Sequence, residues 1–244
     1  MRRGGTINKY FVDSEKFDEM TFKEKAYILI KNSIMFNKFR VEGIYSQDDI
    51  CDEIEISKTP VREALLQLQN EGFVKILRGK GVQIVPVNHG RAKDIIETRL
   101  LLEVNNAYFA ASVLDEISKN EIKSCLDDLE NFLVSKDSNY LYVIDHAFHK
   151  SIAKATKNKI FYKQTCLILD NYLRFENKNV YNNLIDGKIV FEEHRLIAEA
   201  IFNRDPKNAS KNMETHLLKS YNRTLKEIWE KSILFNEKIY KWNY

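Results

Sequence analysis

The sequence predicts a mainly α protein in two parts: an N-terminal winged helix-turn-helix and a larger C-terminal antiparallel α-helical bundle. Three observations support this fold class. Glycine and proline are scarce, at 8 and 3 of 244 residues, so few turns and few strands are expected. Apolar residues recur with a helical period along most of the chain. Paired strand-like runs around a glycine-bearing turn occur between residues 73 and 85.

Composition narrows the class of protein. The chain is 44% hydrophobic and 30% charged, which suits a globular protein with a sizeable core. No stretch approaches eighteen uncharged apolar residues and the N-terminus has no apolar signal core, so we expect a cytoplasmic protein without a membrane span. Cys51, Cys125 and Cys166 are far apart and odd in number, which favours reduced thiols over disulfides or a cysteine zinc site.

The head is organised around a helix that begins near Ser57. Ser57 or Thr59 can cap it, because a side-chain oxygen there accepts from the free N–H groups of the first turn. Upstream, the periodicity predicts a helix over 20–39 and another from Ser46, where Asp49 resembles the second half of a capping box. The helix from Ser46 and the helix near Ser57 are joined by a brief turn at Glu55-Ile56. Two short helices joined in this way form a helix-turn-helix.

Cations mark one side of this head. Lys58 and Arg62 lie beside the helix start, where a helix in a groove meets phosphates and base edges. The strand-like runs 73–77 and 82–85 flank Arg78-Gly79-Lys80-Gly81, a basic hairpin turn suited to the minor groove or the DNA backbone. Taken alone, the helix that begins near Ser57 would fit an ordinary capped surface helix as well as a DNA-reading helix. The order of helix pair, cationic helix and basic hairpin predicts DNA binding.

A boundary at Pro86–Gly90 separates residues 1–87 from a second domain over 91–236, whose pattern is helical almost throughout. Six helices are expected there, and antiparallel helices with short connections make a bundle. Their predicted ranges are 92–116, 119–134, 139–155, 160–175, 189–203 and 206–235.

Four of the five histidines lie in this bundle. Asp145 and His149 are four residues apart, so they share one helix face, and His194 and His216 lie on later helices. One carboxylate and three imidazoles are a plausible set for a divalent metal such as zinc, nickel, manganese or iron. Their spacing alone more often indicates buried, hydrogen-bonded histidines.

The run Ser57–Leu65, followed by Glu71-Gly72 and Gly79-Lys80-Gly81, resembles the winged helix-turn-helix of GntR-family transcription regulators. The family usually has arginine where Lys58 stands. Lysine can hold a phosphate but lacks the bidentate fork, so Arg62 is the expected base-reading residue. The resemblance implies a DNA contact surface made of Ser57, Lys58, Thr59, Arg62, Arg78, Lys80 and Gly81.

The second domain is similar to the FCD effector domain of the same family, in its six-helix, metal-binding subgroup. The matching text includes Arg99–Glu103, Asp145–His149 and Glu193–Ile201. This similarity implies that Asp145, His149, His194 and His216 hold the metal. It also implies that Arg99 meets the carboxylate of a small organic acid, although an internal ion pair with Glu103 is an equal alternative.

These observations predict a transcriptional regulator, with repression as the expected sense. Two chains would pair on a palindromic double-stranded operator, and a small carboxylate bound at the metal would change operator affinity. Two alternatives remain: the same regulator with a metal-free pocket, and a metal-dependent hydrolase. No further acid or base stands out beside the ligands, so we expect no enzyme.

Overall fold

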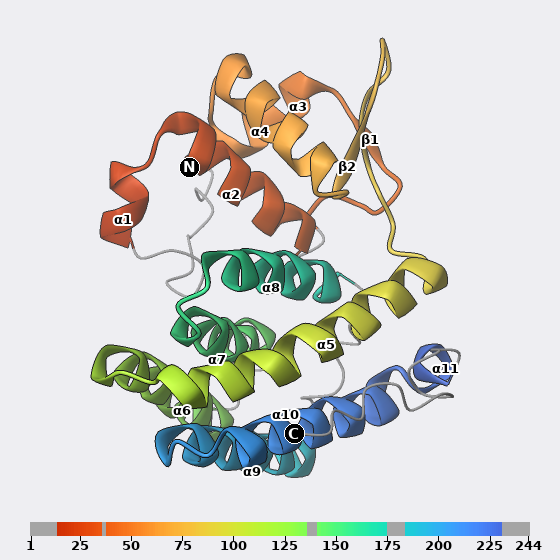
Figure 1. Ribbon diagram of the computed structural model, residues 1–244. Helices are drawn as coiled ribbons and strands as arrows, with labels where there is room; N and C mark the ends of the chain where they lie inside the picture. The colour runs from red at the N-terminus through yellow and green to blue at the C-terminus, as the bar shows by residue number, and fades with distance from the viewer. Residues whose placement is uncertain (1–13, 36–37, 136–140, 175–183, 231–244) are drawn as a thin grey trace. The chain divides into compact units, whose positions relative to one another are not determined.

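The computed structural model describes residues 14–35, 38–135, 141–174 and 184–230 (Figure 1). The chain divides into two compact units, Met1–Val87 and Asn88–Tyr244. The first contains α1 (Ser14–Glu19), α2 (Phe22–Met35), β1 (Ile44–Tyr45), α3 (Gln47–Ile54), α4 (Lys58–Asn70), β2 (Val74–Leu77) and β3 (Gly81–Ile84). The second contains α5 (His89–Val113), α6 (Glu116–Ser135), α7 (Leu141–Ala155), α8 (Lys159–Tyr172), α9 (Leu184–Phe202), α10 (Pro206–Thr224) and α11 (Lys226–Trp229).

In the first unit, α4 packs against α2, against α3 and against strand β2 of a small antiparallel sheet with strand order β1-β3-β2. The β2–β3 hairpin pairs Leu77 with Gly81, which confirms the predicted basic turn between two strands. The apolar face of α4 is fully buried, because its side chains form the core with α2 and β2. Its members are Val61, Ala64, Leu65 and Leu68.

The helix ends follow local chemistry at most positions. Ser46 accepts from the Asp49 backbone N–H at 3.0 Å and its own N–H donates to the Asp49 carboxylate at 2.8 Å, so the predicted capping box is confirmed. Gly72 ends α4 with φ 77°, a left-handed conformation that glycine adopts without strain. The predicted cap of α4 is wrong. Ser57 stands at the N-cap position, but its hydroxyl makes no capping hydrogen bond, and Thr59 already lies inside the helix.

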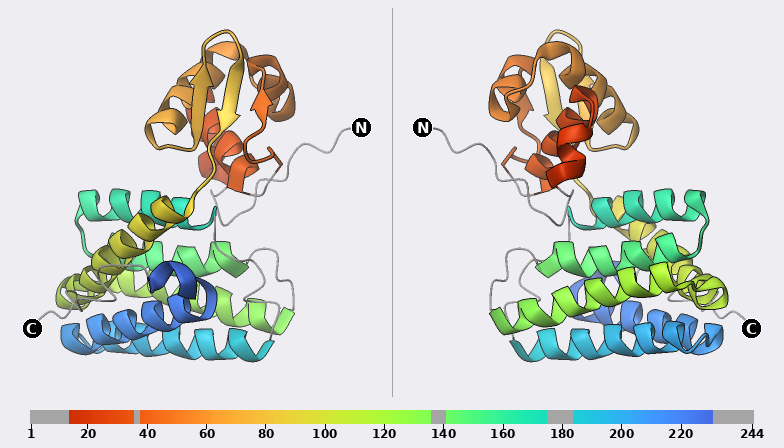
Figure 2. Two further views of the ribbon diagram at one scale, coloured as in Figure 1. Left: turned by 90° about the vertical axis from the view of Figure 1, so that its right-hand side faces the viewer. Right: turned by 90° about the vertical axis from the view of Figure 1, so that its left-hand side faces the viewer.

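The second unit is a bundle in which α5 packs against α7, α8, α9 and α10, while α6 packs against α7 and α9 (Figure 2). The six long helices agree with the sequence prediction, with two differences. Helix α9 begins at Leu184, five residues before the predicted start. The expected last helix breaks at Leu225 instead of continuing, and both Leu225 and Trp229 bury their side chains. Residues 231–235 of that prediction lie outside the described chain.

Cys51, Cys125 and Cys166 are partly buried thiols, and none of them forms a disulfide within the described residues. Among the helices that the structure describes, none has the length and apolar character needed to cross a membrane.

Candidate functional site

Three histidines from three helices meet inside the bundle: His149 of α7, His194 of α9 and His216 of α10. One ring nitrogen of each lies within 4.8 Å of the others, and all three residues are buried. The Nε2 atoms of His149 and His194 are 3.2 Å apart. The predicted histidine ligands are therefore close enough to share one ion.

Each of these rings has an acceptor on its Nδ1 side. His194 Nδ1 lies 2.7 Å from the Val190 carbonyl oxygen, and His216 Nδ1 lies 2.9 Å from Glu193 Oε2. His149 Nδ1 is in direct contact with Glu103 Oε2. A proton held on Nδ1 leaves Nε2 as an unprotonated lone pair, which is the form that binds a metal.

Asp145 lies beside the histidines, one turn before His149 on α7. Its Oδ1 is 3.1 Å from His194 Nε2, and its Oδ2 is 3.9 Å from His149 Nε2. Burial opposes the charge of this carboxyl group, yet neighbouring His194 holds its pKa well below the usual range. Burial and the neighbouring His194 lower the pKa of His216 to about 3, so that ring is neutral near pH 7. Burying a carboxylate beside imidazole lone pairs costs free energy unless a metal cation or bound protons compensate the charge.

Two carboxylates support the rings from outside. Glu103 accepts from Arg99 Nε at 2.5 Å on one oxygen and contacts His149 with the other. Burial opposes its ionisation, but His149 and Arg99 lower the pKa of Glu103 to about 2. The result is a buried chain from Arg99 through Glu103 to His149.

Glu193 makes a similar chain on the other side of the centre. It accepts from His216 Nδ1 and from both terminal nitrogens of Arg223, each at 3.0 Å. Burial opposes the charge, but His216 and Arg223 lower the pKa of Glu193 to about 2. Sequence reasoning gave no role to Glu193 or Arg223. The available signals were that Glu193 adjoins His194 and that Arg223 follows His216 by seven residues, two helical turns on.

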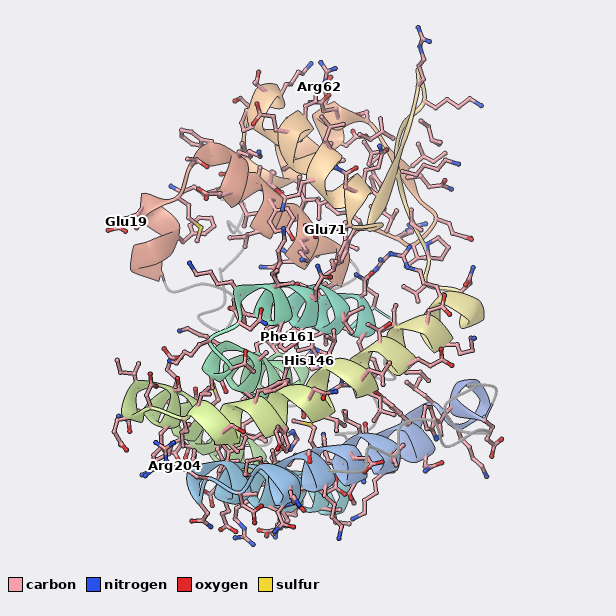
Figure 3. The ribbon with its side chains drawn as sticks, in the orientation of Figure 1. Glu19, Arg62, Glu71, His146, Phe161 and Arg204 are labelled. Atoms are coloured by element: carbon pink, nitrogen blue, oxygen red, sulfur yellow. The ribbon has the colours of Figure 1, made fainter. Side chains whose placement is uncertain are left out.

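Arg99 is 2% exposed, and its guanidinium carbon lies 4.2 Å from the ring centre of Tyr172. Arg99 also forms the ion pair with Glu103, which is one of the two roles expected for it. His146 also lies inside the bundle (Figure 3), with Nε2 3.9 Å from Asp145 Oδ2. Burial and the charge of Arg99 lower the pKa of His146 to about 3.

The expected DNA-contacting residues lie on two elements of the head. Ser57, Lys58, Thr59 and Arg62 are exposed at the start of α4, and Arg62 lies at the surface (Figure 3). Arg78 and Lys80 are exposed in the β2–β3 turn.

Gly81 differs from the other residues of this set because it begins β3 with φ 110°. A Cβ atom there would lie 2.4 Å from the Tyr45 carbonyl oxygen. Glycine at this position therefore allows β1 to pair closely with β3, a structural role that the sequence did not reveal.

Comparison with known proteins identifies a family for each of the two units. Residues 22–84 match the gntR family of bacterial regulatory proteins, and residues 94–219 match the FCD domain. The Exu regulon transcriptional regulator of Escherichia coli (strain K12) is 27% identical over 209 residues, covering 74% of this chain and 78% of that protein. The Uxu operon transcriptional regulator of the same strain is 25% identical over 197 residues, covering 72% and 76%.

Solved structures share the fold. E. coli McbR/YncC superposes with a TM-score of 0.70 at 16% identity, covering 84% of this chain and 99% of that one. A putative transcriptional regulator GntR from Rhodococcus sp. RHA1 gives a TM-score of 0.68 at 16% identity, covering 82% and 96%.

Proposed function

Because the chain belongs to the GntR family of bacterial regulatory proteins and carries an FCD domain, it is a transcriptional regulator and not an enzyme, and we propose that a small organic acid bound at a divalent metal controls its binding to operator DNA. One observation supports this most strongly. Three histidines converge in the bundle, and each has an acceptor on its Nδ1 side.

We assign the metal to Asp145, His149, His194 and His216. The donor set of one carboxylate and three imidazoles suits zinc, nickel, manganese or iron. Glu103, Glu193 and the Val190 carbonyl orient the rings, so little rearrangement would be needed to bind an ion. When bound, the metal supplies a Lewis acid that attracts an anionic ligand. Without a metal, the buried lone pairs of His149 and His194 would face the Asp145 carboxylate with no cation to compensate them, which argues against the metal-free alternative.

We assign the carboxylate of the effector to Arg99. This guanidinium is buried, and its hydrogen bond to Glu103 begins a chain of contacts that ends on His149. A guanidinium suits this role because it offers parallel N–H donors to the two oxygens of a carboxylate. A carboxylate entering the centre would therefore meet a cation already coupled to one of the metal ligands.

The head would bind DNA as half of a homodimer. Two copies would present two α4 helices to successive major-groove faces of a palindromic operator, with Arg62 reading bases and Arg78 and Lys80 holding the backbone. The effector acts only if its affinity differs between DNA-competent and DNA-incompetent states. A protein with this role works in the cytoplasm, where operator DNA is found.

The test begins with protein purified without nickel resin. Elemental analysis should give about one metal ion per chain, and an operator selected from a random duplex library should be bound by the dimer. The variants Asp145→Ala and His194→Ala should lose both the metal and the effector response while retaining operator binding. No metal, even after its addition, would refute the metal assignment. Metal loss without a change in effector response would leave the ion a structural role only.

A further inference from the structure

The first residue of α4 is paired with an acidic residue of α3. Lys58 Nζ lies 2.7 Å from Asp48 Oδ1, and the two side chains are 69% and 63% exposed. The neighbouring Gln47 donates its Nε2 to the Lys58 carbonyl oxygen at 2.8 Å. The starts of the two helices are therefore joined by a side-chain ion pair and by a hydrogen bond to the backbone.

This pair separates Lys58 from the other cations expected to face DNA. Arg62, Arg78 and Lys80 are exposed, and no ion pair joins them to any residue within the described parts of the head. The hydrogen bond and the charge of Asp48 raise the pKa of Lys58, so the lysine stays protonated beside its partner at neutral pH. One of four cations on this surface is thus already neutralised by the protein itself.

We propose that Asp48 competes with DNA phosphate for Lys58 and so limits the sequence-independent part of DNA binding. A cation that neutralises a phosphate releases a counterion, and log affinity then falls with log salt by about 0.9 for each such contact. Lys58 must leave Asp48 before it can make that contact, and the carboxylate left behind repels the phosphate. Asp48 is thus a selectivity residue, and sequence-independent affinity depends mainly on Arg62 and the β2–β3 turn. This inference relies on the DNA-binding head and on neither the metal nor the effector.

Fluorescence anisotropy of a labelled duplex of random sequence, titrated with the full chain at several salt concentrations, tests this role. Asp48→Asn keeps the size of the side chain and removes its charge. We expect this variant to bind the random duplex several-fold more tightly and to steepen the salt slope by about one unit, the value for one added phosphate contact. Asp52→Asn is the matched control. It removes an equal charge one turn along α3, at an exposed residue with no ion pair among the described contacts, and should change the slope far less.

A double-mutant cycle with Lys58→Ala shows whether Asp48 acts through this lysine. Removing Lys58 should cost several-fold more affinity in the Asp48→Asn background than in the natural protein, and the double variant should lose the steeper slope. Equal effects of Asp48→Asn and Asp52→Asn, or a gain that survives without Lys58, would overturn the proposal in favour of general charge repulsion. A natural protein that binds no duplex at low salt would overturn this proposal together with the DNA-binding role of the head. Circular dichroism of each variant checks that the fold is unchanged.

Discussion

His216 Nδ1 lies 2.9 Å from Glu193 Oε2 across the interface of α9 and α10. The residue after Glu193 is His194, which faces the same centre directly. Two neighbours in the chain thus serve one site in different ways: Glu193 orients a ring of another helix, and His194 supplies a ring nitrogen itself. Because the two residues differ in role, a substitution of Glu193 alone tests whether orientation of His216 matters to the proposed centre.

Glu193→Gln should weaken metal binding by about 10- to 100-fold without unfolding the bundle, because a neutral amide orients His216 less firmly than a carboxylate does. Competition with a chromophoric chelator measures this change. Glu192→Gln is the control, since Glu192 is exposed and pairs with Arg195 on the surface. Equal metal affinities for the two variants would show that Glu193 has no part in the centre.

Arg62→Ala should abolish sequence selection while the bundle keeps its metal and its effector. Loss of one cation should also lower the salt slope of binding by about one unit. Arg40→Ala, which removes an exposed arginine from the same head, should retain the selected operator. Selection of an unchanged motif by Arg62→Ala would disprove the assignment of α4 as the base-reading helix.

Acidification should destabilise the metal-free protein before any carboxylate is protonated. His146 and His216 have folded pKa values of about 3, whereas an unfolded histidine titrates near pH 6.5. The unfolded chain therefore binds more protons between these values, so the free energy of unfolding falls as pH falls. The loss between pH 7 and 5.5 is about 1 kcal/mol for each histidine.

Urea unfolding in the presence of a chelator measures this dependence. His146→Gln should make it shallower by about one proton, and comparison with the natural protein removes the contribution of every other group. An unchanged pH dependence would contradict a neutral, buried His146. The stability contributed by ionised Glu103 and Glu193, whose pKa values are about 2, is lost only below about pH 4.3, outside this window.

Gly81→Ala should destabilise the head by about 1–3 kcal/mol, because φ is 110° and the new Cβ would clash with the Tyr45 carbonyl oxygen. Gly79→Ala is the matched control. Its φ is also positive, at 70°, but nothing lies within 4 Å of the added Cβ, so its cost should be nearer 1 kcal/mol. Thermal unfolding of the two variants and of the natural protein measures the two losses of stability. Equal costs would mean that the close approach of β1 to β3 contributes nothing.

The helices could be predicted from the sequence because their apolar period and their capping residues are local properties. The side-chain contacts between helices could not. Whether Glu193 reaches His216 depends on how α9 and α10 are rotated against each other, and whether Asp48 reaches Lys58 depends on the angle between α3 and α4. The break at Leu225 could not be predicted either, since Leu225 and Trp229 are four residues apart and fit a continuous helical pattern.

The residues of the candidate centre are drawn from α5, α7, α9 and α10 and are spread from Arg99 to Arg223. Such a site exists only after all four helices have docked, so an ion that binds it stabilises the native bundle alone, by an amount that grows with the logarithm of the ion concentration. Amide hydrogens in all four helices should then exchange with solvent more slowly together, as one cooperative unit. Helix α5 is the first element after the head in the chain and carries Arg99 and Glu103, so this helix belongs to the same cooperative unit as the candidate centre.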